Sequence, residues 1–116
     1  MTIKRIGPGA RMSKAVVHGN TVYLAGQVAD KMAGKGVAEQ TQEIVDLIDA
    51  ILAEAGSDKT KLLSATIYLA DIATFPEMNS VWDKWVVQGH TPARATVEAK
   101  LAAPQYTVEI AVIAAI

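Results

Sequence analysis

The chain has 116 residues, enough for one domain, with 12 acidic and 11 basic residues and a formal net charge of −1. This balance gives no electrostatic signature of a nucleic-acid-binding protein or of one attracted to an anionic membrane. The lack of cysteine excludes disulfides, thiolate metal ligands and a cysteine nucleophile. The N-terminal residues contain no signal-like apolar run, and no stretch approaches the roughly 20 apolar residues of a membrane span. We therefore expect a soluble, cytoplasmic protein with one domain over residues 1–116.

The first part of the chain predicts short strands. Residues 3–6 are expected to form one strand, and residues 15–18 and 21–24 form two β-rich runs separated by Gly19-Asn20. Two residues of this kind between such runs are typical of a tight hairpin. Gly26 follows at the end of the second run. A glycine there lets a backbone or ligand approach closely, although a β-bulge is the commoner explanation.

Two segments carry helical signals. Apolar residues recur at helical spacing between positions 44 and 55 and predict an amphipathic helix of about 15–18 residues, with Gly56 as its C-terminal cap. The segment 74–77, Thr-Phe-Pro-Glu, has the form of a capping box with proline in the first turn. It predicts a second helix over residues 75 to about 86, with Trp82 and Trp85 on the apolar stripe. We expect these tryptophans in the core or at an interface rather than as a stacking platform.

Three further strands complete the predicted sheet. Residues 62–69 alternate, with Leu63 expected on the same side as Ala65. A strand beginning at Arg94 has one polar face and fits near an edge, whereas residues 106–116 are apolar on both faces and fit the middle of a sheet. Both helices are expected to cover one face. Because the other face is also apolar, we predict a homo-oligomer in which sheet faces pack together.

Arg94 and Glu109 are the leading candidates for a functional site. Arg94 fits either a surface salt bridge or a bidentate clamp on a substrate carboxylate, which suits a planar guanidinium. Glu109 lies inside an apolar strand, where a carboxylate is costly unless paired. It fits either a buried partner for a basic residue or a group that positions and activates water. The two histidines, His18 at the hairpin turn and His90 in a loop, are expected to be structural or exposed.

Several motif classes are missing from the sequence. There is no glycine-rich dinucleotide fingerprint, no phosphate-binding lysine loop and no serine flanked as a nucleophile elbow. No group of His, Asp and Glu has metal-ligand spacing. We therefore expect neither a cofactor nor a metal.

Seven segments together carry a resemblance that covers nearly the whole chain. They are Pro-Ala-Arg-Ala-Thr-Val-Glu at 92–98, Val-Glu-Ile at 108–110, Gly-Asn at 19–20, Ala-Gly-Gln at 25–27, Ala-Gly-Ser at 55–57, Thr-Ile-Tyr-Leu-Ala-Asp at 66–71 and Met-Asn at 78–79. With these segments the chain resembles the reactive-intermediate (enamine/imine) deaminase family, also called Rid or YjgF-like and formerly the endoribonuclease L-PSP family.

The resemblance implies an α+β, chorismate-mutase-like fold: a six-stranded mixed sheet with two helices on one face, assembled as a homotrimer with sites between subunits. It implies hydrolysis of 2-imino or enamino acids to 2-keto acids and ammonia, as in 2-iminobutanoate/2-iminopropanoate deaminases. Arg94 matches the family's carboxylate-binding arginine and Glu109 its water-associated glutamate. The backbone near Gly26 and Thr96 is expected to line the plane of the substrate C=N group.

Three expected pocket positions depart from the best-known branch of that family. Met12 stands where a tyrosine is usual, Ala25 where a serine is usual and Thr96 where a cysteine is usual. Two lost hydroxyls make the predicted pocket drier, so its rate and substrate range are open. The alternatives are a non-enzymatic protein that binds or senses small carboxylates, an endoribonuclease, and a hydrolase of a related small molecule such as a carbamate.

Overall fold

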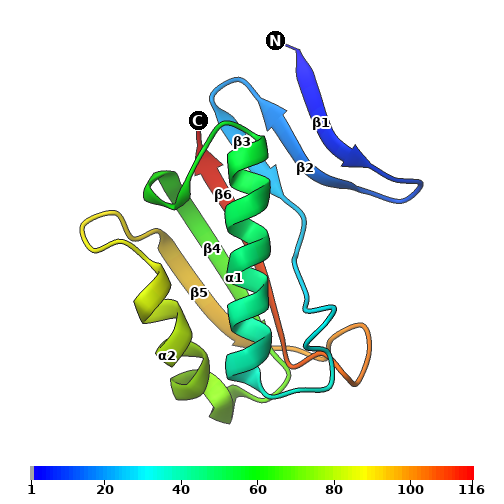
Figure 1. Ribbon diagram of the computed structural model, residues 1–116, viewed down its shortest axis with the longest axis vertical. Coiled ribbons are helices and arrows are strands. Elements are labelled where there is room, and N and C mark those ends of the chain that lie inside the picture. Colours follow the sequence, from blue (N-terminus) through cyan, green and yellow to red (C-terminus); the bar gives the residue numbers. More distant parts are fainter. Residues whose placement is uncertain (1) are drawn as a thin grey trace.

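The computed structural model describes residues 2–116, which form one six-stranded mixed sheet with two helices on one face (Figure 1). The strands are β1 (Ile3–Pro8), β2 (Ser13–His18), β3 (Thr21–Leu24), β4 (Leu62–Leu69), β5 (Ala93–Glu98) and β6 (Val108–Ala115); the helices are α1 (Val37–Glu54) and α2 (Phe75–Trp85); and short 3-10 turns, η1 (Lys59–Lys61) and η2 (Ile72–Thr74), precede β4 and α2. The strand order is β1-β2-β3-β6-β4-β5, and β4 and β5 pair in parallel. The predicted α+β class is therefore confirmed, with the last strand inside the sheet and the Arg94 strand at its edge.

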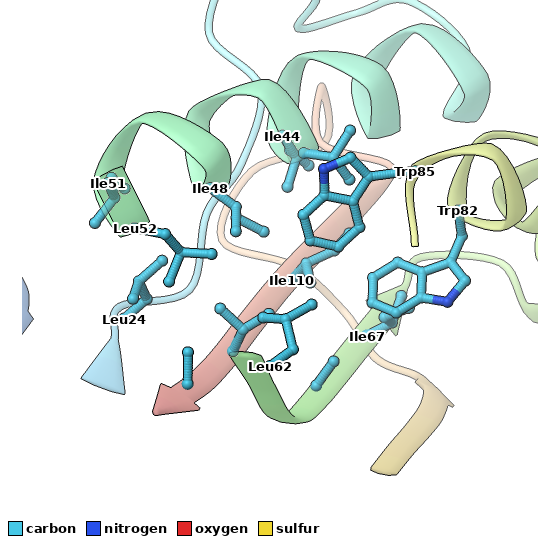
Figure 2. Close-up of a cluster of buried hydrophobic side chains, with 14 of the residues drawn as sticks. Leu24, Ile44, Ile48, Ile51, Leu52, Leu62, Ile67, Trp82, Trp85 and Ile110 are labelled. Carbon is cyan, nitrogen blue, oxygen red and sulfur yellow. The ribbon is translucent and has the colours of Figure 1, made fainter. Parts of the chain in front are cut away.

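The core lies between the helices and one face of the sheet. Along β6 the alternate residues Val108, Ile110, Val112 and Ala114 are buried under the helices. Figure 2 shows Ile110 beneath side chains of α1 and the indole rings of α2. Trp82 and Trp85 are 4% and 6% exposed, so the prediction that they belong to the core is confirmed. Neither α1 nor α2 has the length and apolar character needed to cross a bilayer.

The opposite face of the sheet is covered by no element of residues 2–116. The residues of β6 that point there, among them Glu109 and Ile113, are half-buried. Tyr23 on β3 and Val97 on β5 are 46% and 44% exposed. An apolar face of this kind is the surface expected to pack in a homo-oligomer, which stays a prediction for one chain.

Two local predictions were wrong. Leu63 is 50% exposed, whereas Leu62 is buried, because a register shift between β4 and β6 at this point interrupts the alternation. The capping box at the start of α2 is also absent. Thr74 donates its hydroxyl to the Asp71 carbonyl oxygen (2.6 Å), and its backbone does not have the extended conformation of a capping residue. Glu77 instead accepts a hydrogen bond from the backbone N–H of Ala38 at 2.9 Å.

Side chains of α1 fix the loops at the end of the sheet where β6 begins. Gln40 is fully buried and its amide oxygen accepts a hydrogen bond from the Thr107 N–H (3.0 Å), just before β6. The Glu43 carboxylate accepts from three successive backbone N–H groups, the shortest contact being 2.8 Å to Met32. These bonds, with that from Met32 the strongest influence, hold the pKa of Glu43 below its usual range.

Candidate functional site

Arg94 points toward the helices from the edge strand β5. It pairs with Ala65 of β4, which is 2% exposed beneath the helices, and paired residues on neighbouring strands share a face. Its Nη1 donates a hydrogen bond to Oδ1 of Asn79 on α2 at 2.8 Å. The guanidinium carbon lies 5.4 Å from the ring centroids of Phe75 and Trp82, both also on α2. Arg94 is exposed, yet three contacts from one helix hold it.

A hollow of about 430 Å³ lies beside this guanidinium. It is lined by Ile72, Phe75, Arg94 and Thr96, and we call it the Arg94 hollow. The hydroxyl oxygen of Thr96 is shielded from solvent and has no hydrogen-bond partner within residues 2–116. A buried hydroxyl in that state costs roughly 1–3 kcal/mol. The structure thus brings together two of the predicted substrate-binding residues, Arg94 and Thr96.

Glu109 lies on the uncovered face, packed against Gly26. It pairs with Tyr68 of β4, on the face away from the helices. A Cβ atom built at position 26 would overlap Oε2 of Glu109 and come within 3.0 Å of its carboxyl carbon. The backbone bonds between Gln27 and Ile110, at 2.8 and 3.1 Å, fix this segment beside β6. Glycine is therefore needed at position 26 for the close approach of a carboxylate.

The remaining predicted residues gather around the same glycine. A hollow of about 590 Å³, which we call the Gly26 hollow, lies between the β1–β2 connection and the segment after β3. Its lining includes Met12, Ala25 and Gly26, together with Arg11 and Lys14. Met12 is 69% exposed. Both hollows fall within the range of small-molecule sites.

The two groups of residues do not meet within one chain. Arg94 and Thr96 lie on the helix-covered side of β5, whereas Glu109 lies on the opposite side of β6, two strands away in the sheet (Figure 1). His18 and His90 are exposed and line neither hollow. A larger hollow of about 630 Å³ lies beside the loop after β5, around Lys100, and contains none of the predicted site residues.

Sequence reasoning did not find the role of Asn79 as the partner of Arg94. The signal was available, because Phe75, Asn79 and Trp82 are spaced four and three residues apart and so share one face of a helix. What the sequence lacked was the register between β4 and β5, which decides that Arg94 points toward that helix. No group of three or more histidine and acidic side chains able to hold a metal is found in residues 2–116.

Comparison with known proteins places the whole chain in one group. Residues 2–116 match the family described as Endoribonuclease L-PSP. A RutC family protein of Haemophilus influenzae is 48% identical over 114 residues, covering 98% of each chain, and the RutC family protein YoaB of Escherichia coli is 47% identical over the full length of both. The crystal structure of a YjgF-family protein from Neisseria meningitidis is similar with a TM-score of 0.96 and 46% identity, covering 99% of this chain and 95% of that one.

Proposed function

This chain belongs to the endoribonuclease L-PSP family, also called YjgF-like, and from that premise we propose that it hydrolyses reactive 2-imino acids to 2-keto acids and ammonia. The observation that carries the proposal is the state of Arg94. Its guanidinium is held by a neutral amide and two aromatic rings beside a hollow, which leaves its positive charge available for an anion. A carboxylate is the anion that every 2-imino acid carries.

In the proposed mechanism, Arg94 clamps the substrate carboxylate through two charge-assisted hydrogen bonds. Thr96 lines the same hollow, and rotation of its side chain would turn the hydroxyl, which is shielded from solvent and has no partner within residues 2–116, toward the substrate. Its hydrogen bond would recover the free energy that burial of the hydroxyl costs. The substrate is thereby held with its C=N group in a fixed orientation, and such positioning supplies a large part of the rate enhancement in reactions of this kind.

Glu109 supplies the base in this proposal. The carboxylate takes a proton from water as the water oxygen bonds to the imine carbon, the C=N π electrons move to nitrogen, and the nitrogen receives that proton, which gives a tetrahedral amino alcohol. In the collapse of that intermediate the hydroxyl proton passes to the nitrogen, the C=O bond forms and the C–N bond breaks, so one imine and one water give one keto acid and one ammonia. Gly26 leaves room for the carboxylate, and its hollow offers space for the water and the substrate side chain.

The complete site is proposed to form between protomers of a homotrimer. Arg94 stands on an edge strand, and Glu109 stands on an apolar sheet face that nothing in residues 2–116 covers. Packing of that face against a neighbour would bury Tyr23 and Val97 and could bring the edge of one protomer to the Gly26 hollow of the next. A cyclic trimer would then have three equivalent sites. We place this activity in the cytoplasm.

The experiment is a coupled assay in which an amino-acid oxidase generates imines in situ from a panel of amino acids. Keto-acid and ammonia release are measured with and without the protein. We expect acceleration by the wild type and a loss of roughly 100-fold in kcat/KM for Arg94→Ala, because a clamp on a charged group is removed. An Arg94→Ala variant as fast as the parent would refute the assignment. Dependence of RNA binding on salt would instead favour the nuclease alternative.

A non-enzymatic carboxylate-binding protein is the second candidate. It is favoured by the fact that the Arg94 hollow is formed within one chain, whereas Glu109 lies elsewhere. Binding of 2-keto acids with no acceleration of imine hydrolysis would support this candidate over the enzyme.

A further inference from the structure

One face of α2 contacts the Arg94 side chain. Phe75, Asn79 and Trp82 lie at intervals of four and three residues, which places them one above the other on the same helix face. All three contact the Arg94 guanidinium: the amide through a hydrogen bond of 2.8 Å and the rings at 5.4 Å. An exposed arginine whose only role is to interact with solvent does not need three partner side chains from one helix.

We infer that Asn79 is a positioning residue, which fixes the orientation of Arg94 without neutralising it. This inference rests on the proposed function, in which an Arg94 side chain held in one orientation binds the substrate carboxylate. Arginine has no acceptor, so the oxygen of the Asn79 amide must face it. An amide oxygen accepts a hydrogen bond but carries no net charge. An aspartate at this position would make an ion pair and cancel the charge that a substrate carboxylate needs.

The geometry leaves part of the guanidinium free. Arginine has five N–H donors, and Asn79 takes one of them at Nη1. The rings of Phe75 and Trp82 attract a cation through their π faces without competing for its N–H donors. The donors that remain are sufficient for a bidentate bond to a carboxylate in the Arg94 hollow.

The helix that carries this face is itself well anchored. The indole N–H of Trp85 donates to the Asp49 carboxylate of α1 at 3.0 and 3.1 Å. The ring of Trp85 packs on that of Trp82 with centroids 5.2 Å apart. Glu98, at the end of β5, accepts from the N–H of Ile72 at 3.0 Å and so ties the Arg94 strand to the turn before α2. The relative position of Arg94 and Asn79 is therefore fixed from both sides.

A structural role and a positioning role predict opposite rankings of two substitutions. If Asn79 only stabilises the fold, Asn79→Asp is the milder change, because it replaces a hydrogen bond to Arg94 by an ion pair. If Asn79 positions a free cation, Asn79→Asp is the more damaging change for ligand binding, although not for stability. Asn79→Ala removes the amide oxygen that accepts the hydrogen bond and leaves the positive charge of Arg94 unchanged.

The test compares wild type, Asn79→Ala and Asn79→Asp, with Ser80→Asp as the matched control. Ser80 is the next residue of α2 and is exposed, so Ser80→Asp adds the same charge outside the contact. Pyruvate binding is followed by tryptophan fluorescence, because Trp82 lies against the guanidinium, and imine hydrolysis is followed at steady state. Urea unfolding gives the stability of each variant.

We expect Asn79→Ala to raise KM and the pyruvate Kd about 10-fold, with kcat within about 3-fold of wild type. The reason is that Arg94 is then held less rigidly but keeps its positive charge. Asn79→Asp should raise both by about 100-fold or more while unfolding at a urea concentration no lower than that of Asn79→Ala. Ser80→Asp should match wild type. Pyruvate binding by Asn79→Asp as tight as that of Asn79→Ala, or no binding by wild type, would overturn the inference. A wild type that binds pyruvate but leaves imine hydrolysis unaccelerated would refute the proposed function alone.

Discussion

Two inactive variants should restore activity when they share one oligomer. The substrate imine carbon is bonded to the carboxylate carbon, about 1.5 Å away, so the clamp and the base have to converge on neighbouring atoms. In one chain the Cα atoms of Arg94 and Glu109 are separated by two strand spacings of about 4.8 Å and three residue rises of about 3.3 Å, or about 14 Å. Their side chains also point to opposite faces. A proposed site must therefore take Arg94 from one protomer and Glu109 from another.

The perturbation is a pair of single variants, Arg94→Ala and Glu109→Gln, each purified and each expected to be nearly inactive. The two are mixed in equal amounts, unfolded in urea and refolded together so that protomers exchange. In a random mixture a given protomer has an intact Arg94 half of the time, and its neighbour an intact Glu109 half of the time. About a quarter of the interfaces then hold both groups, so the mixture should recover about 25% of wild-type kcat.

Native mass spectrometry on the refolded sample confirms that mixed oligomers have formed and gives the number of protomers. Each variant refolded alone is the control, and mixing without unfolding shows whether exchange is needed. If mixed oligomers are present and their activity does not exceed that of the separate variants, the site is not shared between chains. A monomeric wild type at micromolar concentration would refute the same reasoning more directly.

Two further predictions follow from side-chain contacts. Gly26→Ala should lower kcat/KM roughly 10- to 100-fold, because its Cβ would displace the Glu109 carboxylate, whereas Gly36→Ala, which places its Cβ no closer than 3.4 Å to a flexible side chain, should not. Glu43→Gln should lower the urea midpoint near pH 7, with Glu54→Gln as the control. Because backbone hydrogen bonds, that from Met32 first, depress the folded-state pKa of Glu43, its contribution is complete above the usual value of about 4.3 and is lost as the pH falls through the folded value. The urea midpoints of Glu43→Gln and the wild type should therefore converge once the pH is below the folded-state pKa. Midpoints that differ equally at pH 7 and pH 3 would contradict this.

Local sequence patterns predicted most of the fold because each element carries its own period. The apolar repeat of α1 and the Gly19-Asn20 turn act over a few residues, and both appear where the sequence indicated. Strand β6 is apolar on both faces, and this pattern predicted that it lies inside the sheet, where both faces of a strand are shielded from water. A pattern of that kind can be recognised in the sequence of one strand, without knowing which strands pair with it.

Features that depend on pairing between distant segments were not predictable. Alternation along β5 showed that Arg94 and Thr96 share a face, but only the register with β4 decides which face that is. The same holds for Leu63, whose exposure follows from a register shift against β6. Thr74 failed as a cap because the turn η2 before α2 uses its hydroxyl, and that turn has no strong signature in the sequence.

The two hollows differ in how tightly they specify a ligand. In the Arg94 hollow the cation is held by three contacts and the Thr96 hydroxyl has no partner within residues 2–116, so the proposed ligand carboxylate would meet the guanidinium in one orientation. The Gly26 hollow is lined by Met12, which is largely exposed, and by Ala25, which has no polar side-chain atom. A flexible thioether and a methyl group place few directional demands on a substrate, so the directional groups of this hollow are the charged side chains of Arg11 and Lys14. If this site is the one used, the carboxylate end of the substrate should be selected strictly, and the range of accepted side chains should depend on position 12 together with the charges of Arg11 and Lys14.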